Sequence, residues 1–500
     1  MKKWKWIHKW FSLTLGLFVI LWAVSGIILN HRNLVSGIDV NRNWLPEVYR
    51  YHNWNNAAIR GGLQLGGDSL LIYGNVGIWL TDTVFSAYNP FWEGFPDGAN
   101  NRKINKVFKT KSGKVYAATQ SGLYQLDTKK SVWRNIPFDL HDSRFLDITQ
   151  REDKLVFLTR SELILADDQE NPMHFSRFEL PRVVDDDGRV GLFRTLWVLH
   201  SGEIYGQLGI LLVDLLAVIL LFLVVSGYIW FFYPKWIRRR KRTSKSVVDQ
   251  VSHLKFNQKW HNKLGIWVVA FLLFNTFTGM FLRPPLLIAI AESRVAKIPF
   301  SALSDPNPWQ DQLRMIHWNS NGNYWIIGTN EGLYQADANF QNLLKPFKTK
   351  PPLSVMGINV FEELSAGVFA VGSFNGLFLW QPDQEYVRDM ITGAIPKATA
   401  NTGSPIGMHM IAGMIRFNER SMLFDYDRGL MHETVGMPDK IEHQPMPLWN
   451  LALEVHTARI FQALIGDFYI LIIPLFGLAF LLILWAGLMR WLKKKKVIFK

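Results

Sequence analysis

The sequence predicts a membrane α-helical bundle of four transmembrane helices, arranged as a duplicated pair, and an all-β periplasmic domain that forms a β-propeller from two chain segments. Three observations predict this fold class: four long apolar stretches, clusters of basic residues at their ends, and repeats of alternating apolar residues between them. Of the 500 residues, 49% are hydrophobic and 19% are charged, so apolar spans alternate with ordinary soluble sequence.

The first apolar stretch, residues 8–31, has a histidine at each end and carries no charged residue from Phe11 to Leu29. It is long enough to cross a hydrocarbon layer of about 30 Å. When His8 is aligned with His261 without a gap, Gly26 falls on Gly279. A span that repeats a histidine near its start and a glycine near its end indicates a duplicated membrane unit.

Basic clusters at residues 2–5, 235–245 and 493–496 set the expected orientation. With the N-terminus in the cytoplasm, all three clusters lie on the cytoplasmic side, as the positive-inside rule requires. We therefore interpret the net charge of +14 as a membrane signal and not as a sign of nucleic-acid binding. The expected parts are transmembrane helix 1 (1–31), a periplasmic β segment (32–199), transmembrane helix 2 (200–234), a basic cytoplasmic loop (235–258), transmembrane helix 3 (259–285), a second periplasmic β segment (286–455), and transmembrane helix 4 with a basic tail (456–500).

The two expected periplasmic segments share a repeat. Residues 103–127 resemble residues 312–337, and both alternate apolar strands with glycine turns. The repeat recurs every ~40 to 50 residues within each half, a period typical of propeller blades. One six-bladed ring interrupted by the membrane hairpin fits this pattern, and so do two separate three-unit β domains. Weaker copies of the repeat lie at residues 69–82, 154–167, 367–380 and 420–433.

Histidines occupy equivalent places at the expected span ends. His8 and His261 begin the first and third spans, His200 and His456 begin the second and fourth, and His31 ends the first. Neutral imidazole is an axial ligand of haem iron, and helix bundles build such sites from facing side chains. We expect one or two b-type haems, one held by His8 and His261, the other by His200 with His456 or His31. The alternative is that these histidines are interfacial anchors.

Four glycines are expected to lie at the same depths in the membrane as these histidines. Gly26 and Gly279 lie about five helical turns after the histidines that begin their spans, on the same helical face and about 27 Å away. Gly227 and Gly487 lie near the cytoplasmic ends of the second and fourth spans. Small residues at these levels allow a macrocycle or another helix to approach closely. Plain helix packing is the alternative.

Two acidic residues, Asp214 and Asp467, fall inside the second and fourth spans. Carboxylates at membrane depth are costly and usually face a partner. At about 100° per residue, each acid shares the helical face of the histidine that begins its span. They are candidates for orienting a ligand, contacting a quinol or relaying protons. The alternative is a protonated acid that is hydrogen bonded to a neighbouring helix.

The chain contains no cysteine, which excludes disulfides, cysteine zinc sites, iron–sulfur clusters and covalently attached c-type haem. It also has no Walker loop, no dinucleotide glycine fingerprint and no HExxH motif. The expected cytoplasmic parts are too small to hold a flavin or NADPH domain. Electrons must therefore come from a membrane quinol or from a separate cytoplasmic or membrane donor.

The three segments at residues 8–32, 199–227 and 260–279 resemble the PepSY-associated transmembrane family of bacterial inner-membrane proteins. Members of this family include haem-containing reductases that reduce ferric siderophores on the periplasmic side, and the resemblance implies such an activity for this chain. It also implies that His8, His200 and His261, with His456 by position, correspond to the family's span-start histidines. Outside the membrane, the chain carries the propeller-like repeats instead of a PepSY-type domain.

We therefore expect an inner-membrane haem b protein that passes electrons to a periplasmic acceptor, which is a ferric chelate such as a ferric siderophore or a protein partner. This function is a haem-dependent ferric reductase type of activity in iron uptake. One alternative is a non-enzymatic sensor or binding module, in which the helices only anchor or signal. A further alternative is a transporter coupled to protons or metal ions through Asp214 and Asp467.

Overall fold

The computed structural model describes residues 2–138, 143–170, 173–354, 357–396, 407–417, 420–432 and 434–498. The chain divides into two compact units. The membrane unit comprises residues 1–35, 188–305 and 449–500, and the β unit comprises residues 36–187 and 306–448. The two expected β segments therefore contribute to one compact unit.

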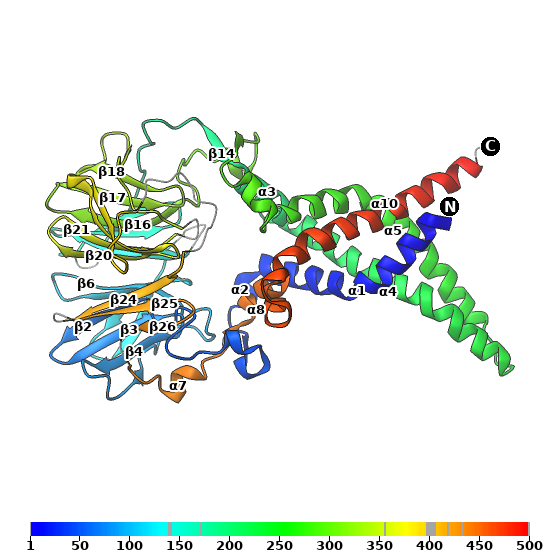
Figure 1. Ribbon diagram of the computed structural model, residues 1–500, viewed down its shortest axis with the longest axis horizontal. Helices are drawn as coiled ribbons and strands as arrows, with labels where there is room; N and C mark the ends of the chain where they lie inside the picture. The colour runs from blue at the N-terminus through cyan, green and yellow to red at the C-terminus, as the bar shows by residue number, and fades with distance from the viewer. Residues whose placement is uncertain are drawn as a thin grey trace. The chain divides into compact units, whose positions relative to one another are not determined.

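Four long helices form the core of the membrane unit, and each is long and apolar enough to cross a membrane (Figure 1). They are α1 (Lys2–Asn30), α4 (Gly206–Arg242), α5 (Val248–Met280) and α10 (Ile472–Ile498). Helices α1 and α5 each pack against both α4 and α10, which makes a four-helix bundle. The shorter elements are α2 (Arg32–Val35), α3 (Leu192–Ser201), η3 (Glu203–Tyr205), α6 (Leu286–Ile290), η4 (Ala302–Ser304), α8 (Leu448–His456), η6 (Arg459–Phe461), α9 (Gln462–Ile465) and η7 (Gly466–Leu471).

The connection between α4 and α5 differs from the expected loop at 235–258. Helix α4 continues through Pro234 to Arg242, and α5 begins at Val248, so only residues 243–247 lie between the helices. Arginine and lysine are good helix formers, so the basic sequence extends the helix where the sequence reading placed a loop.

The second and fourth spans are not continuous with the histidines that precede them. His200 lies in α3, and the turn η3 separates it from α4. His456 ends α8, and η6, α9 and η7 separate it from α10. The helical-face counts that related these histidines to Asp214 and Asp467 therefore do not apply, because a rotation of about 100° per residue requires an unbroken helix.

In the described part of the β unit there are six antiparallel sheets of three or four strands, and each contains one copy of the sequence repeat. Neighbouring strands follow each other along the chain. The first three sheets are β2 (Gly61–Gly66), β3 (Ser69–Gly74), β4 (Gly77–Asp82) and β5 (Asn89–Pro90); β6 (Ile104–Lys109), β7 (Val115–Thr119), β8 (Leu123–Asp127) and β9 (Val132–Ile136); and β10 (Phe145–Arg151), β11 (Lys154–Thr159), β12 (Leu163–Asp167) and β13 (Phe175–Phe178). The other three are β16 (Leu313–Asn319), β17 (Tyr324–Thr329), β18 (Leu333–Asp337) and β19 (Lys345–Pro346); β20 (Ile358–Ser365), β21 (Val368–Ser373), β22 (Gly376–Gln381) and β23 (Tyr386–Asp389); and β24 (Ile411–Phe417), β25 (Arg420–Asp425) and β26 (Gly429–Met431).

Smaller elements accompany the sheets. The β unit also contains η1 (Arg42–Trp44), η2 (Glu47–Tyr49), η5 (Pro382–Gln384) and α7 (Asp439–Glu442). Two short strand pairs lie where the chain passes between the units: β1 (Asp39–Val40) pairs with β27 (Met446–Pro447), and β14 (Arg189–Gly191) pairs with β15 (Arg294–Ala296).

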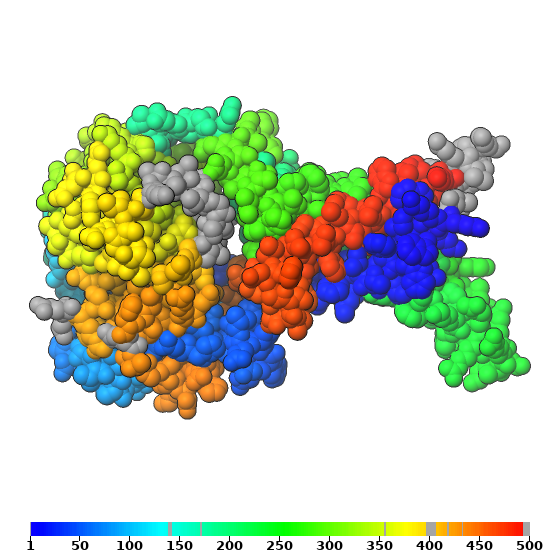
Figure 2. Space-filling view, in the orientation of Figure 1, coloured from blue at the N-terminus to red at the C-terminus, as the bar shows by residue number. Residues whose placement is uncertain are grey.

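The six sheets pack in a closed ring. Each of six apolar core clusters joins two neighbouring sheets, including the sixth sheet and the first. In Figure 1 the strands β24 and β25 lie beside β2 and β3, and Figure 2 shows the last sheet adjoining the first at the surface. The all-β expectation is confirmed, and of the two arrangements that the repeats allowed, the structure has the single six-bladed ring.

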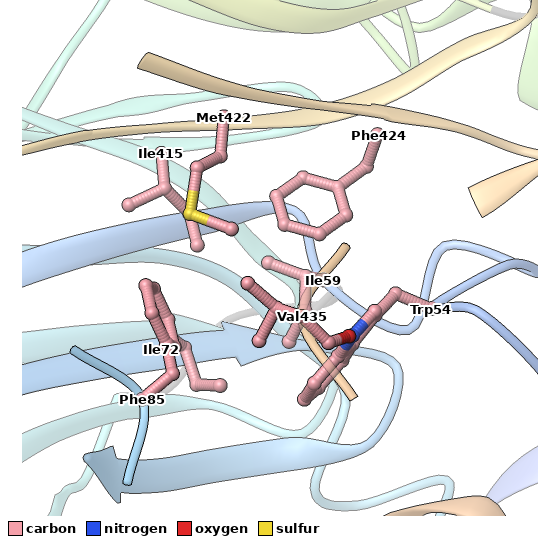
Figure 3. Close-up of a pocket in the computed structure, with 8 residues that line it drawn as sticks. All are labelled: Trp54, Ile59, Ile72, Phe85, Ile415, Met422, Phe424 and Val435. Atoms are coloured by element: carbon pink, nitrogen blue, oxygen red, sulfur yellow. The ribbon is translucent and has the colours of Figure 1, made fainter. Parts of the chain in front are cut away.

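Ring closure depends on the segment before β2. The backbone N–H of Leu430 donates to the carbonyl of Asn53 at 2.8 Å, and the Asn53 side chain donates to the carbonyl of Arg428 at 2.7 Å. Figure 3 shows the apolar hollow behind this closure, where the Trp54 indole donates to the carbonyl of Val435 at 2.9 Å. Its lining belongs to the core shared by the first and sixth sheets, so we interpret the hollow as part of the closure packing: Trp54, Ile59, Ile72, Phe85, Ile415, Met422, Phe424 and Val435.

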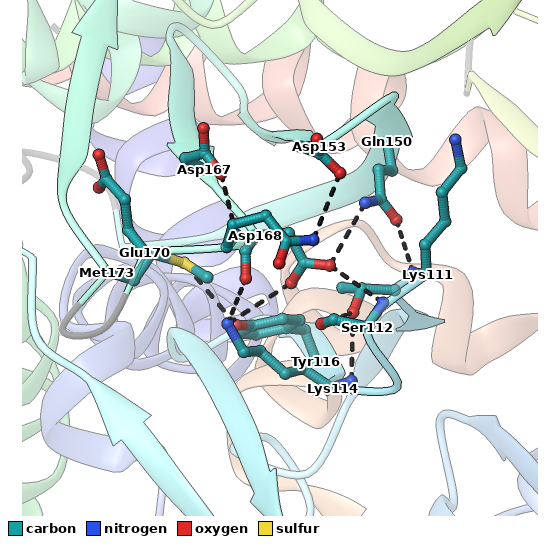
Figure 4. A network of polar contacts seen from close by, with 12 residues as sticks. Lys111, Ser112, Lys114, Tyr116, Gln150, Asp153, Asp167, Asp168, Glu170 and Met173 are labelled. Atoms are coloured by element: carbon teal, nitrogen blue, oxygen red, sulfur yellow. Dashed lines mark hydrogen bonds and ion pairs between the residues drawn. The ribbon is translucent and has the colours of Figure 1, made fainter.

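A polar network around Asp168 joins the second and third sheets (Figure 4). Asp168 is 1% exposed, and its Oδ2 accepts hydrogen bonds from the Ser112 backbone at 3.2 Å and from the Gln150 amide at 3.4 Å. Burial opposes ionisation of Asp168, but hydrogen bonds from Ser112 and the nearby Lys114 ammonium outweigh it and lower the pKa of the carboxyl group. The network therefore fixes one blade against the next through a buried carboxylate.

At the axis of the ring, charged side chains from opposite blades meet. Lys106 on β6 forms an ion pair with Glu362 on β20 at 3.4 Å. The Glu362 carboxylate raises the pKa of Lys106, and burial raises the pKa of the nearby Asp147 carboxyl. Asp147 also accepts a hydrogen bond from the Ile316 backbone at 3.0 Å, which links the third blade to the fourth. These contacts stabilise the centre of the propeller.

Candidate functional site

The candidate site in the membrane unit consists of two pairs of histidines. In the first pair, the rings of His8 and His261 have centres 6.2 Å apart and planes at 80°. His8 Nδ1 lies 3.0 Å from the carbonyl oxygen of Ile483 on α10, and His261 Nδ1 lies 2.7 Å from the Ser226 hydroxyl on α4. Each ring is therefore anchored by a neighbouring helix.

The second pair repeats this arrangement. The rings of His200 and His456 have centres 6.0 Å apart and planes at 55°. His200 Nδ1 lies 3.0 Å from the carbonyl of Asn275, and the Asn275 amide donates to the carbonyl of His200 at 2.8 Å. His456 Nδ1 lies 3.1 Å from the carbonyl of Trp22. The sequence left open whether His456 or His31 lies with His200, and the structure places His456 there.

Each histidine ring lies against a glycine of a neighbouring helix. A side chain at that glycine would meet the imidazole, so the small residue leaves room for the ring. The distance from an ideal Cβ on the glycine to the histidine Cε1 is 3.3 Å for Gly487 and His8, 3.7 Å for Gly227 and His261, 2.5 Å for Gly279 and His200, and 3.3 Å for Gly26 and His456.

The anchoring carbonyls follow one rule. His8, His200 and His456 each bind a backbone carbonyl of the helix whose glycine their ring contacts. In each case the carbonyl belongs to the residue four positions before that glycine: Ile483, Asn275 or Trp22. The four glycines and these carbonyls therefore form one binding arrangement that occurs at both levels of the bundle.

The hydrogen bonds also determine which nitrogen of each ring is protonated. A carbonyl oxygen only accepts, so Nδ1 of His8, His200 and His456 carries the hydrogen in these contacts. The Ser226 hydroxyl donates to the carbonyl of Leu223 at 3.0 Å, so its oxygen accepts from Nδ1 of His261. In each neutral ring the lone pair is then on Nε2, as in histidines that bind a metal.

The spacing within each pair fits a metal bound between two imidazoles. With metal–nitrogen bonds of about 2 Å and about 1 Å from each nitrogen to its ring centre, two opposite imidazole ligands have centres about 6 Å apart. The observed separations are 6.2 Å and 6.0 Å. Within the described residues, no group of three or more His, Cys, Asp or Glu side chains is placed to hold a metal ion. Each candidate site therefore consists of two imidazoles.

His31 lies in a different cluster. Its Nε2 is 2.5 Å from Oδ2 of Asp214, whose Oδ1 accepts a hydrogen bond from the Asn30 amide at 2.9 Å. The side chains of His31 and Asp214 are 24% and 13% exposed. The Asn30 amide also lies 3.4 Å from the carbonyl of Ser201, which follows His200. The structure therefore places a carboxylate–imidazole pair beside the second histidine pair.

Asp467 has no corresponding environment. It lies in η7, before α10, and its side chain is exposed. The two acids that seemed equivalent in the sequence thus occupy different surroundings, and only Asp214 contacts a histidine within the described residues.

Neither Arg490 nor Trp230 was recognised as a site residue in the sequence. The Arg490 guanidinium lies 6.0 Å from the centre of the Trp230 ring, and that ring lies 5.5 Å from the ring of His261. The sequence signal for these two residues is their spacing. Each lies three residues after a glycine that contacts a histidine of the first pair, Gly487 or Gly227.

Comparison with solved structures finds proteins that share 8 to 13% sequence identity with the chain. The extracellular domain of the hybrid two-component system BT4673 of B. thetaiotaomicron is 11% identical, with a TM-score of 0.35, over 76% of this chain and 39% of that one. PorZ of Porphyromonas gingivalis is 8% identical, with a TM-score of 0.34, over 74% and 37%. The Cps50 (Swd1) β-propeller domain of Myceliophteria thermophila is 9% identical, with a TM-score of 0.32, over 78% and 88%. The chain thus spans about two fifths of the length of the first of these.

No curated protein matches the sequence. The model of the family described as the PepSY-associated TM region matches residues 5–494. This match includes all four histidines of the two pairs and the four glycines against which they lie. The family resemblance of the apolar segments is thereby confirmed, and the chain belongs to the PepSY-associated TM family.

Proposed function

We propose that this protein is a haem b protein of the bacterial inner membrane that transfers electrons across the membrane to an acceptor outside the cytoplasm. The observation that carries the proposal is the occurrence of two histidine pairs, each with ring centres about 6 Å apart and each seated on glycines of neighbouring helices. His8 and His261 would hold one haem, and His200 and His456 the other. Bound haem supplies one-electron redox chemistry, which the protein side chains lack.

The chain's own residues prepare the sites. The backbone carbonyls of Ile483, Asn275 and Trp22 orient three of the imidazoles, and the Ser226 hydroxyl orients the fourth. Because these contacts fix the ring positions before a ligand binds, little reorganisation is needed on binding.

The two levels are far enough apart to serve opposite sides of a membrane. His8 and Gly26 lie on the same helix, and 18 residues at ~1.5 Å per residue separate the levels by about 27 Å along α1. Phe18 lies between them on α1 and packs against Phe476 of α10, with ring centres 4.9 Å apart. An apolar helix bundle of this kind keeps water and bulk ions away from the sites.

The His31–Asp214 pair is the candidate for proton exchange. A carboxylate that accepts from one imidazole nitrogen holds the ring in place and leaves the other nitrogen free to exchange a proton. The pair is partly exposed, and Asp214 lies on the apolar helix α4, so a membrane hydroquinone is the donor class that fits it best. A separate cytoplasmic or membrane protein is the second donor class.

The basic clusters support an orientation with both termini in the cytoplasm and the β unit in the periplasm. The propeller would then receive the acceptor, for which a ferric chelate is our proposal, with a role in iron acquisition. A protein partner is the other acceptor class. The outer domain sets this choice, because the membrane histidines carry no information about the acceptor.

Vesicles test this function directly. The protein is reconstituted into liposomes that contain a trapped reductant, and a ferric chelate is added outside with a chelator that detects ferrous iron. We expect external iron reduction with the wild type and loss of it in His8→Ala. Equal rates in protein-containing and protein-free vesicles would exclude transmembrane electron transfer.

A further inference from the structure

We propose that Arg490 and Trp230 form an oxyanion-binding site beside the first histidine pair, and that its ligand is a carboxylate side chain of the haem bound there. This inference rests on the proposed function. It adds a binding role for two residues that lie outside the set of ligands and glycines.

The helix register places both residues at the site. Gly487 on α10 lies against the ring of His8, and Arg490 follows Gly487 by about one helical turn. Gly227 on α4 lies against the ring of His261, and Trp230 follows Gly227 by the same interval. The duplication thus brings two equivalent positions together.

The contacts of these two residues define the geometry. The guanidinium of Arg490 lies 6.0 Å from the centre of the Trp230 ring, within the range of a cation–π interaction. The edge of the Trp230 ring faces His261, with ring centres 5.5 Å apart and planes at 84°. The charge of Arg490 also acts on both imidazoles of the first pair. The guanidinium is therefore adjacent to the histidines but is not one of the groups that anchor them.

The charge of Arg490 calls for an anion. A guanidinium stays ionised in proteins, and a charge within a membrane span is usually paired. Arg490 lies three residues before the end of the fourth span at Lys493, and among the described residues its guanidinium contacts an aromatic ring and not a carboxylate. An oxyanion placed beside the first pair would satisfy this charge through a planar, charge-assisted contact.

The second pair lacks this arrangement. The residues three positions after Gly26 and Gly279 are Leu29 and Leu282. Two arginines at this end of the bundle already have partners: Arg459 forms an ion pair with Glu454, and Arg283, four residues after Gly279, donates a hydrogen bond to Tyr469 and lies close to Glu454. The proposed site is therefore specific to the first pair, and this asymmetry makes it testable within one molecule.

Two sources provide an oxyanion at this place, the haem carboxylates and the phosphate of a phospholipid. The position next to His261 favours the haem, because a headgroup phosphate would be bound equally well by the exposed Lys493 on the same helix. Lys493 is the matched control, since it lies one turn after Arg490 on the same helix and its side chain is exposed.

The experiment uses the full-length chain in lipid nanodiscs, loaded with iron protoporphyrin IX or with its dimethyl ester, which has no carboxylate charge. Release of each to apomyoglobin is followed by absorbance. In the wild type we expect one half of the bound ester to be released roughly tenfold faster than the corresponding half of the bound acid. A tenfold difference is the effect expected from the loss of one charge-assisted contact. In Arg490→Gln this difference disappears for that half, Arg490→Lys restores part of it, and Lys493→Gln matches the wild type.

Other outcomes would overturn the inference. If Arg490→Gln keeps the wild-type difference between acid and ester, Arg490 does not hold a haem carboxylate. If the variant alters release only when anionic lipid replaces zwitterionic lipid, Arg490 binds an anionic headgroup and not a haem carboxylate. If the wild type takes up neither compound, the proposed function itself fails, and that result is distinguishable from failure of the carboxylate site alone.

Discussion

Gly279 lies directly against the imidazole of His200, so that a Cβ at this glycine would come within 2.5 Å of the His200 Cε1 atom. Contacts this short are not tolerated between non-bonded carbon atoms, and the His200 ring is also tied to the carbonyl of Asn275. The glycine is therefore a requirement for the observed position of the ring. The corresponding distance at Gly227 is 3.7 Å, which is an ordinary van der Waals contact.

This difference predicts unequal effects of the same substitution. Gly279→Ala displaces His200, so we expect loss of about half of the bound haem. The affinity for haem at the His200–His456 pair should fall more than tenfold. Gly227→Ala is the matched control, and we expect it to keep the full haem content. The haem-to-protein ratio of the purified variants measures both. Equal haem content in the two variants would show that the glycines serve only helix packing.

Asp214 and Asp467 provide a second matched comparison. Asp214 contacts His31 and Asn30, whereas Asp467 is exposed in η7. In Asp214→Asn the carboxylate that orients His31 is lost, so we expect reduction by a hydroquinone analogue to slow by roughly tenfold. Asp467→Asn should match the wild type, and both variants should still be reduced fully by dithionite. Equal rates for Asp214→Asn and the wild type would remove this pair from the mechanism.

In the β unit, Gly429 is a specific test of ring closure. Its φ is 79°, and a Cβ there would lie 1.6 Å from the carbonyl oxygen of Asn53. Gly113 has a φ of 86° but no atom within 4 Å of an added Cβ. We expect Gly113→Ala to cost about 1–2 kcal/mol through backbone strain alone.

Gly429→Ala should cost considerably more, because the segment that carries Asn53 must move away from β26. Hydrogen exchange of the full-length protein checks this, with loss of protection in β26 and in residues 53–56. Similar protection in both variants would mean that this contact does not hold the ring closed.

Asp168 gives a prediction for pH dependence. Its carboxylate is buried and has a lowered pKa, so it stabilises the fold at pH values above the pKa of an unfolded aspartate, about 4. This contribution is lost as the pH falls through the lower pKa of the folded state. Asp168→Asn should reduce the free energy of local unfolding at pH 7 by about 1–3 kcal/mol, and this deficit should shrink in acid.

The exposed Asp153 on the same sheet is the control for Asp168. We expect Asp153→Asn to change the free energy of unfolding by less than about 0.5 kcal/mol. Hydrogen exchange of β7 and β11 at several pH values provides the measurement. A deficit that stays constant with pH would show that the charge of Asp168 does not contribute.

The sequence predicted the six sheets well because the signal is local. Alternating apolar residues form the strands, and turn glycines such as Gly77, Gly122 and Gly376 have positive φ values that other residues rarely adopt. The closure of the ring was not predictable, because Asn53 and Trp54 adopt positive φ without being glycine and contact residues almost 400 positions away.

The membrane site shows the same limit. Regular helix geometry predicted the levels of His8, His261 and the four glycines, since these residues lie on the long apolar helices α1, α4, α5 and α10. It did not predict that His200 and His456 lie in short helices that precede the second and fourth spans. It also left open which histidine faces His200, because that choice depends on how the helices pack. The contact of His31 with Asp214 likewise depends on that packing.

The haem content of the purified full-length protein, with its dithionite-reduced spectrum, tests the central claim most directly. The account predicts two b-type haems per chain, one in His8→Ala, one in His200→Ala, and two in His31→Ala. A colourless wild-type protein that is folded, or a haem content unaffected by replacing His8 and His200, would contradict it.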